Sequence, residues 1–197
     1  MSQVTAKTMR WCSLLVLAVT LLRGEVIVCL GDSLTAGYGL EESQAWPALI
    51  QAQRPQWTVI NAGISGDTTA GGLRRLPWVL KAKPTTVVIA LGGNDGLRGL
   101  DETRTKANLA ALIAGCQAAK ARVILAGMQL PTSMGPAYRE RFAGIFPQLA
   151  AESQITLLPF LLAGVAGHPE LNQADGIHPT AEGQKIIAAL VLPLLEP

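Results

Sequence analysis

The chain has 197 residues, enough for one domain with a full hydrophobic core. Hydrophobic residues make up 49% of it and charged residues 15%, a balance that excludes a disordered protein. The net charge is +2, but residues 1–24 hold three basic residues and no acidic one. The rest of the chain therefore has a net charge of −1, which gives no electrostatic basis for binding nucleic acid.

The N-terminus has the charge order of a targeting segment. Lys7 and Arg10 precede an almost wholly apolar stretch, residues 11–22, which is short for a membrane span. A buried helix of the domain is the alternative interpretation. Because no clean small-residue cleavage site follows, we expect residues 1–24 to be a signal peptide or an uncleaved membrane anchor and residues 25–197 to be the folded domain. The protein is then periplasmic or secreted, or membrane-anchored if the segment is not cleaved.

The folded part alternates short apolar runs with helical segments. The predicted strands are 26–30, 58–61, 86–91, 122–126 and 155–157. The first, third and fourth are nearly continuous apolar runs, typical of a sheet that is covered on both faces. The predicted helices are 44–53, 68–81, 102–119, 136–153 and 180–195, with Pro77 as a candidate break in the second. This alternation predicts one α/β domain with a parallel, doubly wound sheet.

Unusual polar motifs directly follow the first three predicted strands. They are Gly31-Asp32-Ser33-Leu34, Gly63-Ile64-Ser65-Gly66-Asp67 and Gly92-Gly93-Asn94-Asp95, and a fourth, Asp175-Gly176-Ile177-His178, precedes the last helix. In such sheets ligands bind beyond the carboxyl ends of the strands. We therefore expect the motifs to converge on one site. The aspartates of the first three motifs, Asp32, Asp67 and Asp95, are expected to hold loops and cap helices.

Ser33, Asp175 and His178 match the residue types of a nucleophile, an orienting carboxylate and a base. The three-residue spacing lets the Asp175 carboxylate turn back to the imidazole Nδ1–H, which leaves Nε2 free to take a proton. Ser33 follows a strand, where the next helical segment would aim its backbone N–H at a bound anion. A plain turn is the alternative for each motif. His168 has no such carboxylate and is expected to be an ordinary surface residue.

Acyl transfer also needs hydrogen-bond donors for a tetrahedral oxyanion. The candidates are the backbone N–H groups of Ser33 and Gly66 and the side-chain amide of Asn94, although a glycine turn and a helix cap would explain the last two. Leu97 and Leu100 follow closely and are candidate contacts for an acyl chain, unless they pack beneath the loop. No cluster has metal-ligand spacing, so we expect neither a metal nor a cofactor.

The four blocks, in this order, resemble the SGNH (GDSL) hydrolase superfamily. The longer stretches 64–68 and 91–99 resemble the group of bacterial periplasmic acyl-CoA thioesterase I, lysophospholipase L1 and arylesterase. The resemblance covers roughly residues 25–195 and implies a flavodoxin-like, three-layer α/β/α sandwich with a parallel five-stranded sheet. It also implies a catalytic triad of Ser33, Asp175 and His178, and an oxyanion hole of Ser33, Gly66 and Asn94.

The predicted function is a monomeric serine hydrolase that cleaves small acyl esters and thioesters, with membrane proximity through its N-terminal segment. A carbohydrate deacetylase or short-chain arylesterase is the alternative within the superfamily, and a non-catalytic lipid- or sugar-binding protein is an alternative outside enzymes. A nucleotide-binding domain would have a similar fold, but neither G-x-G-x-x-G nor a P-loop motif is present. The G-x-S-x-G motif of α/β-hydrolases is also absent.

Overall fold

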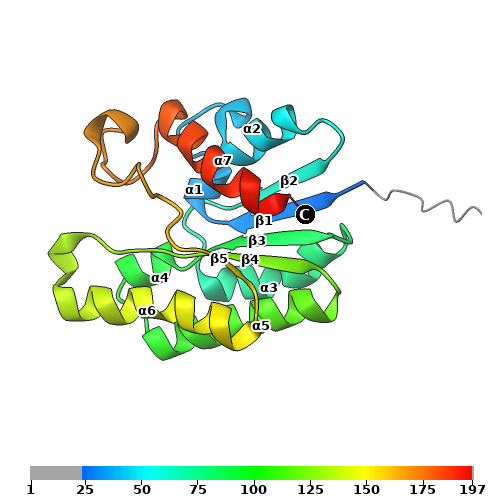
Figure 1. The fold of residues 1–197 in the computed structure, drawn as a ribbon. Coiled ribbons are helices and arrows are strands. Elements are labelled where there is room, and N and C mark those ends of the chain that lie inside the picture. The colour runs from blue at the N-terminus through cyan, green and yellow to red at the C-terminus, as the bar shows by residue number, and fades with distance from the viewer. Residues whose placement is uncertain (1–23, 197) are drawn as a thin grey trace, which may run out of the picture.

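The computed structural model describes residues 24–196, so the predicted targeting segment lies outside the described residues apart from Gly24. Five parallel strands form one sheet in the order β2-β1-β3-β4-β5 (Figure 1). Their bounds are β1 Val26–Gly31, β2 Thr58–Gly63, β3 Thr86–Ala90, β4 Arg122–Ala126 and β5 Thr156–Leu158. This is the flavodoxin-like strand order. The predicted α/β fold and parallel five-stranded sheet are confirmed.

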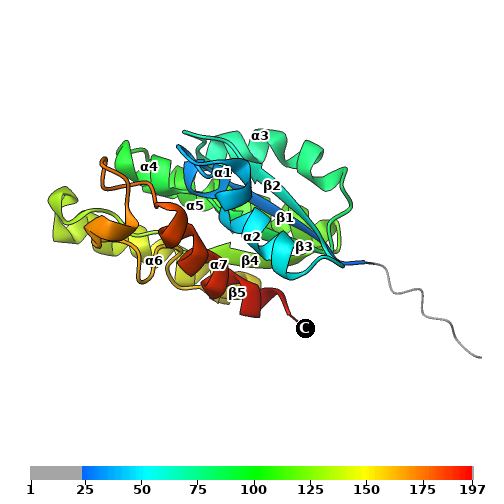
Figure 2. The same cartoon turned by 90° about the horizontal axis from the view of Figure 1, so that it is seen from above.

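Helices cover both faces of the sheet (Figures 1 and 2). Helices α2 (Trp46–Gln53) and α7 (Ala181–Leu195) pack against each other on one face, and α3 (Thr69–Leu80), α5 (Glu102–Ala118) and α6 (Pro136–Ser153) cover the other. The central strand β3 is buried along its whole length, in agreement with its unbroken Thr-Val-Val-Ile-Ala sequence. The molecule is therefore a three-layer sandwich.

The expected break at Pro77 is wrong, because α3 runs through this residue to Leu80. Proline lacks only its own backbone N–H, so the helix loses one hydrogen bond, to the carbonyl of residue 73. Only three helical residues follow Pro77, so little of the helix depends on that turn. The helical segment expected at Ser33 is the short helix α1 (Ser33–Ala36), whereas the sequence patterns missed the short helix α4 (Gly93–Leu97) that follows β3.

The strand register brings the polar motifs to one level at the end of the sheet. Gly31 is paired with Gly63 on one side and with Ala90 on the other. The chain leaves β1 toward β2 on one side and returns to β3 on the other, which makes this end of β1 the topological switch point. The residues that follow these three strands are therefore neighbours in space.

The described cysteines, Cys29 and Cys116, are free and buried, as expected of small core residues. Burial raises the pKa of the Cys116 thiol to about 11, so this thiol stays protonated at neutral pH. Within residues 24–196, no helix combines the length and the apolar character needed to span a membrane.

Candidate active site

The three residues expected to act together form a continuous chain of hydrogen bonds. Ser33 Oγ lies 2.9 Å from His178 Nε2, and His178 Nδ1 lies 2.7 Å from Asp175 Oδ2. Ser33 and His178 are 145 positions apart in sequence, so the fold rather than local structure brings them together. An imidazole in this position can take the Ser33 hydroxyl proton at Nε2 while its Nδ1–H is held by a carboxylate.

Asp175 is held in the ionised, acceptor-only form that this arrangement requires. Its Oδ1 accepts hydrogen bonds from the backbone N–H groups of Ile177 (2.9 Å) and His178 (3.0 Å), and its Oδ2 faces the imidazole. The backbone N–H of His178, the His178 ring and the Ile177 N–H lower the pKa of Asp175 to about 2. The local Asp-Gly-Ile-His turn thus builds both the carboxylate and its contact with the base.

Ser33 is the first residue of α1, a helix of one turn that starts at the end of β1. The Asp32 side chain caps this helix by accepting from the Leu34 N–H at 3.0 Å. Gly31 is required just before it, because a Cβ at this position would lie 2.0 Å from Thr35 Oγ1. The chain therefore passes directly from a buried strand into a helix, which places the Ser33 N–H among the unpaired N–H groups at the helix start.

Gly66 lies in the loop after β2, at the third position of a turn closed by a 3.0 Å hydrogen bond from the Asp67 N–H to the Ile64 carbonyl. Its φ of +78° is the left-handed value that favours glycine in this turn. The Gly66 carbonyl accepts from the Arg98 guanidinium at 2.9 Å, so α4 and the residue after it hold the loop beside the site.

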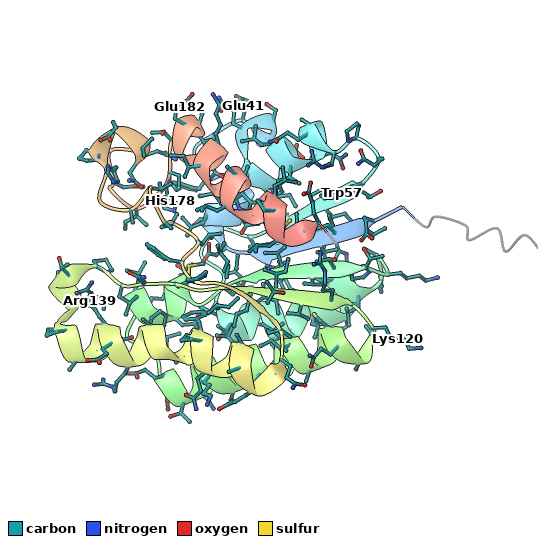
Figure 3. All side chains as sticks on the ribbon, viewed as in Figure 1. Glu41, Trp57, Lys120, Arg139, His178 and Glu182 are labelled. Atoms are coloured by element: carbon teal, nitrogen blue, oxygen red, sulfur yellow. The ribbon has the colours of Figure 1, made fainter. Side chains whose placement is uncertain are left out.

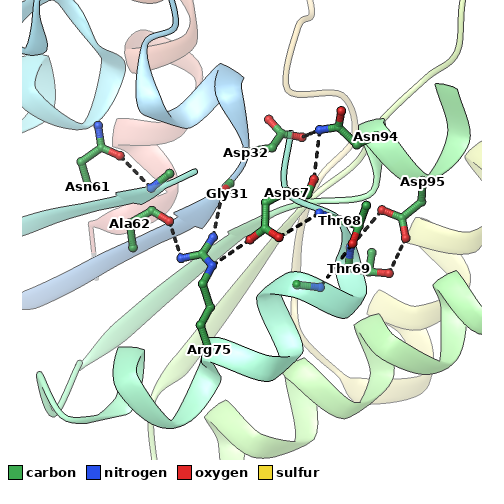
Figure 4. A network of polar contacts seen from close by, with 12 residues as sticks. Gly31, Asp32, Asn61, Ala62, Asp67, Thr68, Thr69, Arg75, Asn94 and Asp95 are labelled. Carbon is green, nitrogen blue, oxygen red and sulfur yellow. Dashed lines mark hydrogen bonds and ion pairs between the residues drawn. The ribbon is translucent and has the colours of Figure 1, made fainter. Parts of the chain in front are cut away.

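Asn94, in α4, points its side-chain amide toward the ends of β1 and β2 (Figure 4). Its Nδ2 donates to the Asp67 carbonyl at 3.0 Å and to Asp32 Oδ2 at 3.3 Å. The second contact is long, so this hydrogen is the more weakly held of the two. The structure thus places all three expected donors, from Ser33, Gly66 and Asn94, on adjoining segments, with the Asn94 amide engaged by protein acceptors.

Asp32 is a buried carboxylate in the floor of the site, with 2% of its surface exposed. Burial raises the pKa of Asp32 to about 6, although the Leu34 N–H, the charge of His178 and the Asn94 amide act in the opposite direction. The nearby charge of Asp67 raises the pKa further. The sequence indicates a capping role for Asp32, which is confirmed, but it does not reveal the contact with Asn94.

Arg75 ties the ends of β1 and β2 together from helix α3 (Figure 4). Its guanidinium donates to the carbonyls of Gly31 (2.8 Å) and Ala62 (2.6 Å), and its Nε donates to Asp67 Oδ2 at 2.8 Å. In the neighbouring motif, Asp95 is buried and accepts from the Thr69 backbone N–H at 2.9 Å. The aspartates expected to hold loops do so, whereas Arg75 had no recognisable signal in the sequence.

A cavity of about 640 Å³ opens beside Ser33 and His178. Asn94 and Leu97 line one part of it, and Ile177 lines another. The loops after β4 and β5 form the remaining walls, which are mostly apolar, with Met128, Leu130, Pro131, Thr132, Phe160 and Leu162. These loop residues have no chemical motif in the sequence, so the cavity wall could not be foreseen from it.

The two leucines expected near the site are placed differently. Leu97 lines the cavity, whereas Leu100 is 44% exposed and is not among the lining residues. Tyr138, which follows the loop after β4, also stays outside the lining; its hydroxyl donates to the Gly96 carbonyl at 3.0 Å. Tyr138 therefore holds α4, and with it Asn94 and Leu97, in position.

Two further residues contact His178 or the loop that carries it. The Tyr38 ring lies against the His178 ring with a centroid separation of 4.5 Å. Gln173 Nε2 donates to the carbonyls of Tyr38 (2.7 Å) and Pro179 (3.0 Å), and so joins the segment after α1 to the loop that carries His178. In the sequence, the glycines on both sides of Tyr38 predict an irregular loop, but they do not predict the contact of Tyr38 with His178. His168 is exposed beside Glu170, as expected of a surface residue.

In the part of the chain that the structure describes, no group of three or more His, Cys, Asp or Glu side chains is arranged to hold a metal ion. The side chains around Ser33 instead offer a nucleophile, a base and hydrogen-bond donors. This set suits acyl transfer.

The chain is similar to known esterases and thioesterases. The chain is 44% identical over 191 residues to "Esterase TesA" of Pseudomonas aeruginosa, which covers 94% of this chain and 95% of the relative. It is 42% identical over 175 residues to "Thioesterase 1/protease 1/lysophospholipase L1" of Escherichia coli K12, with 88% and 84% covered. A crystal structure of TesA matches with a TM-score of 0.85 at 44% identity and covers 88% of this chain and 99% of that one.

The family model for GDSL-like lipases and acylhydrolases matches residues 29–186, a span that includes every polar motif of the site. The resemblance seen in the sequence is therefore confirmed, and the chain belongs to the GDSL-like lipase/acylhydrolase family.

Proposed function

We propose that the protein is a serine hydrolase that cleaves carboxylic esters and thioesters of acyl chains through an acyl-enzyme on Ser33. The observation that carries this proposal is the unbroken chain of hydrogen bonds from Asp175 through His178 to Ser33. Family membership and the names of the relatives, an esterase and a thioesterase/lysophospholipase, support the same reaction class. The substrate is a small acyl ester or thioester, and no cofactor takes part.

In the proposed reaction, His178 Nε2 takes the proton of Ser33 as Oγ attacks the acyl carbonyl. The resulting oxyanion accepts hydrogen bonds from the Ser33 and Gly66 N–H groups and from the Asn94 amide. His178 then returns the proton to the departing alcohol or thiol, which leaves the acyl group on Ser33. Water then attacks this ester while His178 Nε2 takes its proton, and the imidazole passes that proton to Ser33 Oγ as the acyl–oxygen bond breaks and the carboxylic acid leaves.

We expect kcat/KM for p-nitrophenyl esters to rise several-fold per added pair of carbons, from acetyl up to a limit set by the cavity. The apolar walls motivate this, because each buried methylene contributes about 0.8 kcal/mol of transfer free energy. Leu97→Ala should reduce the gain for long chains, while Leu100→Ala, outside the cavity lining, should leave the chain-length profile unchanged.

The same series, run with thioesters of matched chain length, distinguishes the two ester classes. A maximum at acetyl followed by a steady decline would contradict the acyl-chain proposal. It would favour the alternative function, a carbohydrate deacetylase or a short-chain arylesterase.

We also propose that residues 1–24 export the enzyme and that it acts as a monomer in the periplasm or outside the cell. The support comes from the sequence, where Lys7 and Arg10 precede an apolar stretch. Expressed in a Gram-negative host, the full chain should yield esterase activity in the periplasmic fraction, and deletion of residues 1–24 should confine it to the cytoplasm. Activity that stays with the membrane fraction would indicate an uncleaved anchor instead, and cytoplasmic activity from the full chain would contradict export.

A further inference from the structure

Arg139 is a cation in the wall of the cavity that the proposed reaction does not use. It lies in the first turn of α6, is half-buried, and lines the cavity together with Ser33 and His178. Its Nε donates to the Leu130 carbonyl at 2.9 Å, which fixes one edge of the guanidinium. The two terminal nitrogens make no hydrogen bond to any residue that the structure describes. Figure 3 shows Arg139 and His178 at the same end of the sheet, on its two sides.

The surroundings of Arg139 leave its charge without a partner. It has no carboxylate within 4.0 Å among residues 24–196, whereas Arg141, two positions along the same helix, pairs with Glu102 at 2.9 Å. The first turn of α6 contains no acidic residue, so the positive end of the helix dipole adds to the charge of Arg139. Among residues 24–196, the only carboxylate in the cavity lining is Asp32, which accepts from the Leu34 N–H and the Asn94 amide.

Arg139 is also the only Lys or Arg side chain in the lining of the cavity, as far as the structure describes the chain. A planar guanidinium with two free terminal nitrogens matches a carboxylate or a phosphate through paired hydrogen bonds. The same cavity wall includes the apolar side chains of Leu130, Phe160 and Leu162. Because one edge of the Arg139 guanidinium is fixed and its terminal nitrogens are free, the side chain is preorganised to bind an anion.

We propose that Arg139 is a specificity residue that binds an anionic group of the substrate, a carboxylate or a phosphate, while Ser33 attacks the acyl carbonyl. This inference rests on the proposed hydrolase function. The anionic group has two possible sources, the far end of the acyl chain or the leaving group. Both present the same chemistry to the guanidinium, so two pairs of matched substrates distinguish them.

The first pair, p-nitrophenyl hexanoate and mono-p-nitrophenyl adipate, differs only by a carboxylate at the end of the acyl chain. The second pair, phenyl hexanoate and 4-(phosphonooxy)phenyl hexanoate, differs by a phosphate on the leaving group. We expect Arg139→Gln to lower kcat/KM for the anionic member of one pair by about 10- to 100-fold, the range of a charged hydrogen bond. The neutral esters should change by less than about threefold, and Arg139→Lys should restore part of the loss. Raising the ionic strength should weaken the wild-type preference for the anionic ester.

Arg141→Gln is the matched control, because it removes the same charge from the same helix outside the cavity lining. Equal losses on neutral and anionic esters after Arg139→Gln would overturn the inference, and so would an equal effect of Arg141→Gln. If the wild-type enzyme hydrolyses the neutral esters but Arg139→Gln leaves the anionic ones unaffected, only this inference fails. If the wild-type enzyme hydrolyses none of the four esters, the proposed function fails and takes the inference with it.

Discussion

Replacing Ser33 with alanine should lower kcat for ester hydrolysis by on the order of 10⁴–10⁶ and leave the fold unchanged. The loss is large because Ser33 Oγ is the atom that His178 Nε2 contacts, at 2.9 Å, and alanine offers no nucleophile in its place. The fold should survive because the side chain makes this one hydrogen bond, which is worth about 1 kcal/mol. Steady-state kinetics and thermal unfolding check the two halves of the expectation.

A fluorophosphonate probe gives an independent measurement for the same variant. The wild-type enzyme should be labelled covalently at one site, and Ser33→Ala should lose the label. Ser153→Ala, at the far end of α6, should keep both labelling and hydrolysis. Labelling that persists on Ser33→Ala would show that another residue is the nucleophile.

The sequence predicts those parts of the site whose geometry depends on residues that are close together in the chain. Gly31, Gly66 and Gly92 mark sharp turns after three predicted strands, and parallel strands must end at one edge of the sheet. The Asp-Gly-Ile-His turn places a carboxylate beside its histidine through three residues of chain. For these reasons the polar motifs were predicted to converge, and the register of β1 with β2 and β3 shows how they do.

The parts that the sequence did not reveal depend on contacts between distant segments. Met128, Leu130 and Phe160 look like ordinary loop residues until the ends of β4 and β5 bring them to the cavity. The guanidinium of Arg75 reaches two strand ends from a helix 13 and 44 residues away in sequence, which no spacing rule encodes. Arg139 likewise resembles any surface arginine until its place in the wall is known.

The contact between Asp32 and Asn94 also joins segments that are distant in sequence, and it predicts how substitutions at these two residues change kcat. Asn94→Ala should lower kcat by about 10²–10³ with little change in KM, because an oxyanion donor acts mainly in the transition state. We expect Asp32→Asn to cause a loss of the same order, although Asp32 touches no reacting atom. A carboxylate accepts at both oxygens, from the Leu34 N–H and from the Asn94 amide. The side-chain amide of an asparagine has a single accepting oxygen, so its NH2 group would face an N–H of either Leu34 or Asn94. We expect it to face Asn94, so that the Asn94 amide turns away from the position in which it can donate to the oxyanion.

Two measurements separate this positioning role from general damage to the fold. The double variant of Asp32→Asn and Asn94→Ala should lose no more kcat than Asn94→Ala alone, because both changes remove the same donor.

The second measurement is the free energy of unfolding against pH. Burial raises the pKa of Asp32 from 3.8 to about 6, so the unfolded chain releases this proton at a lower pH than the folded protein does. The wild-type free energy of unfolding should therefore contain a contribution that falls from about pH 4 to about pH 6, and Asp32→Asn should remove it. Full kcat in Asp32→Asn, or additive losses in the double variant, would show that Asp32 does not position Asn94.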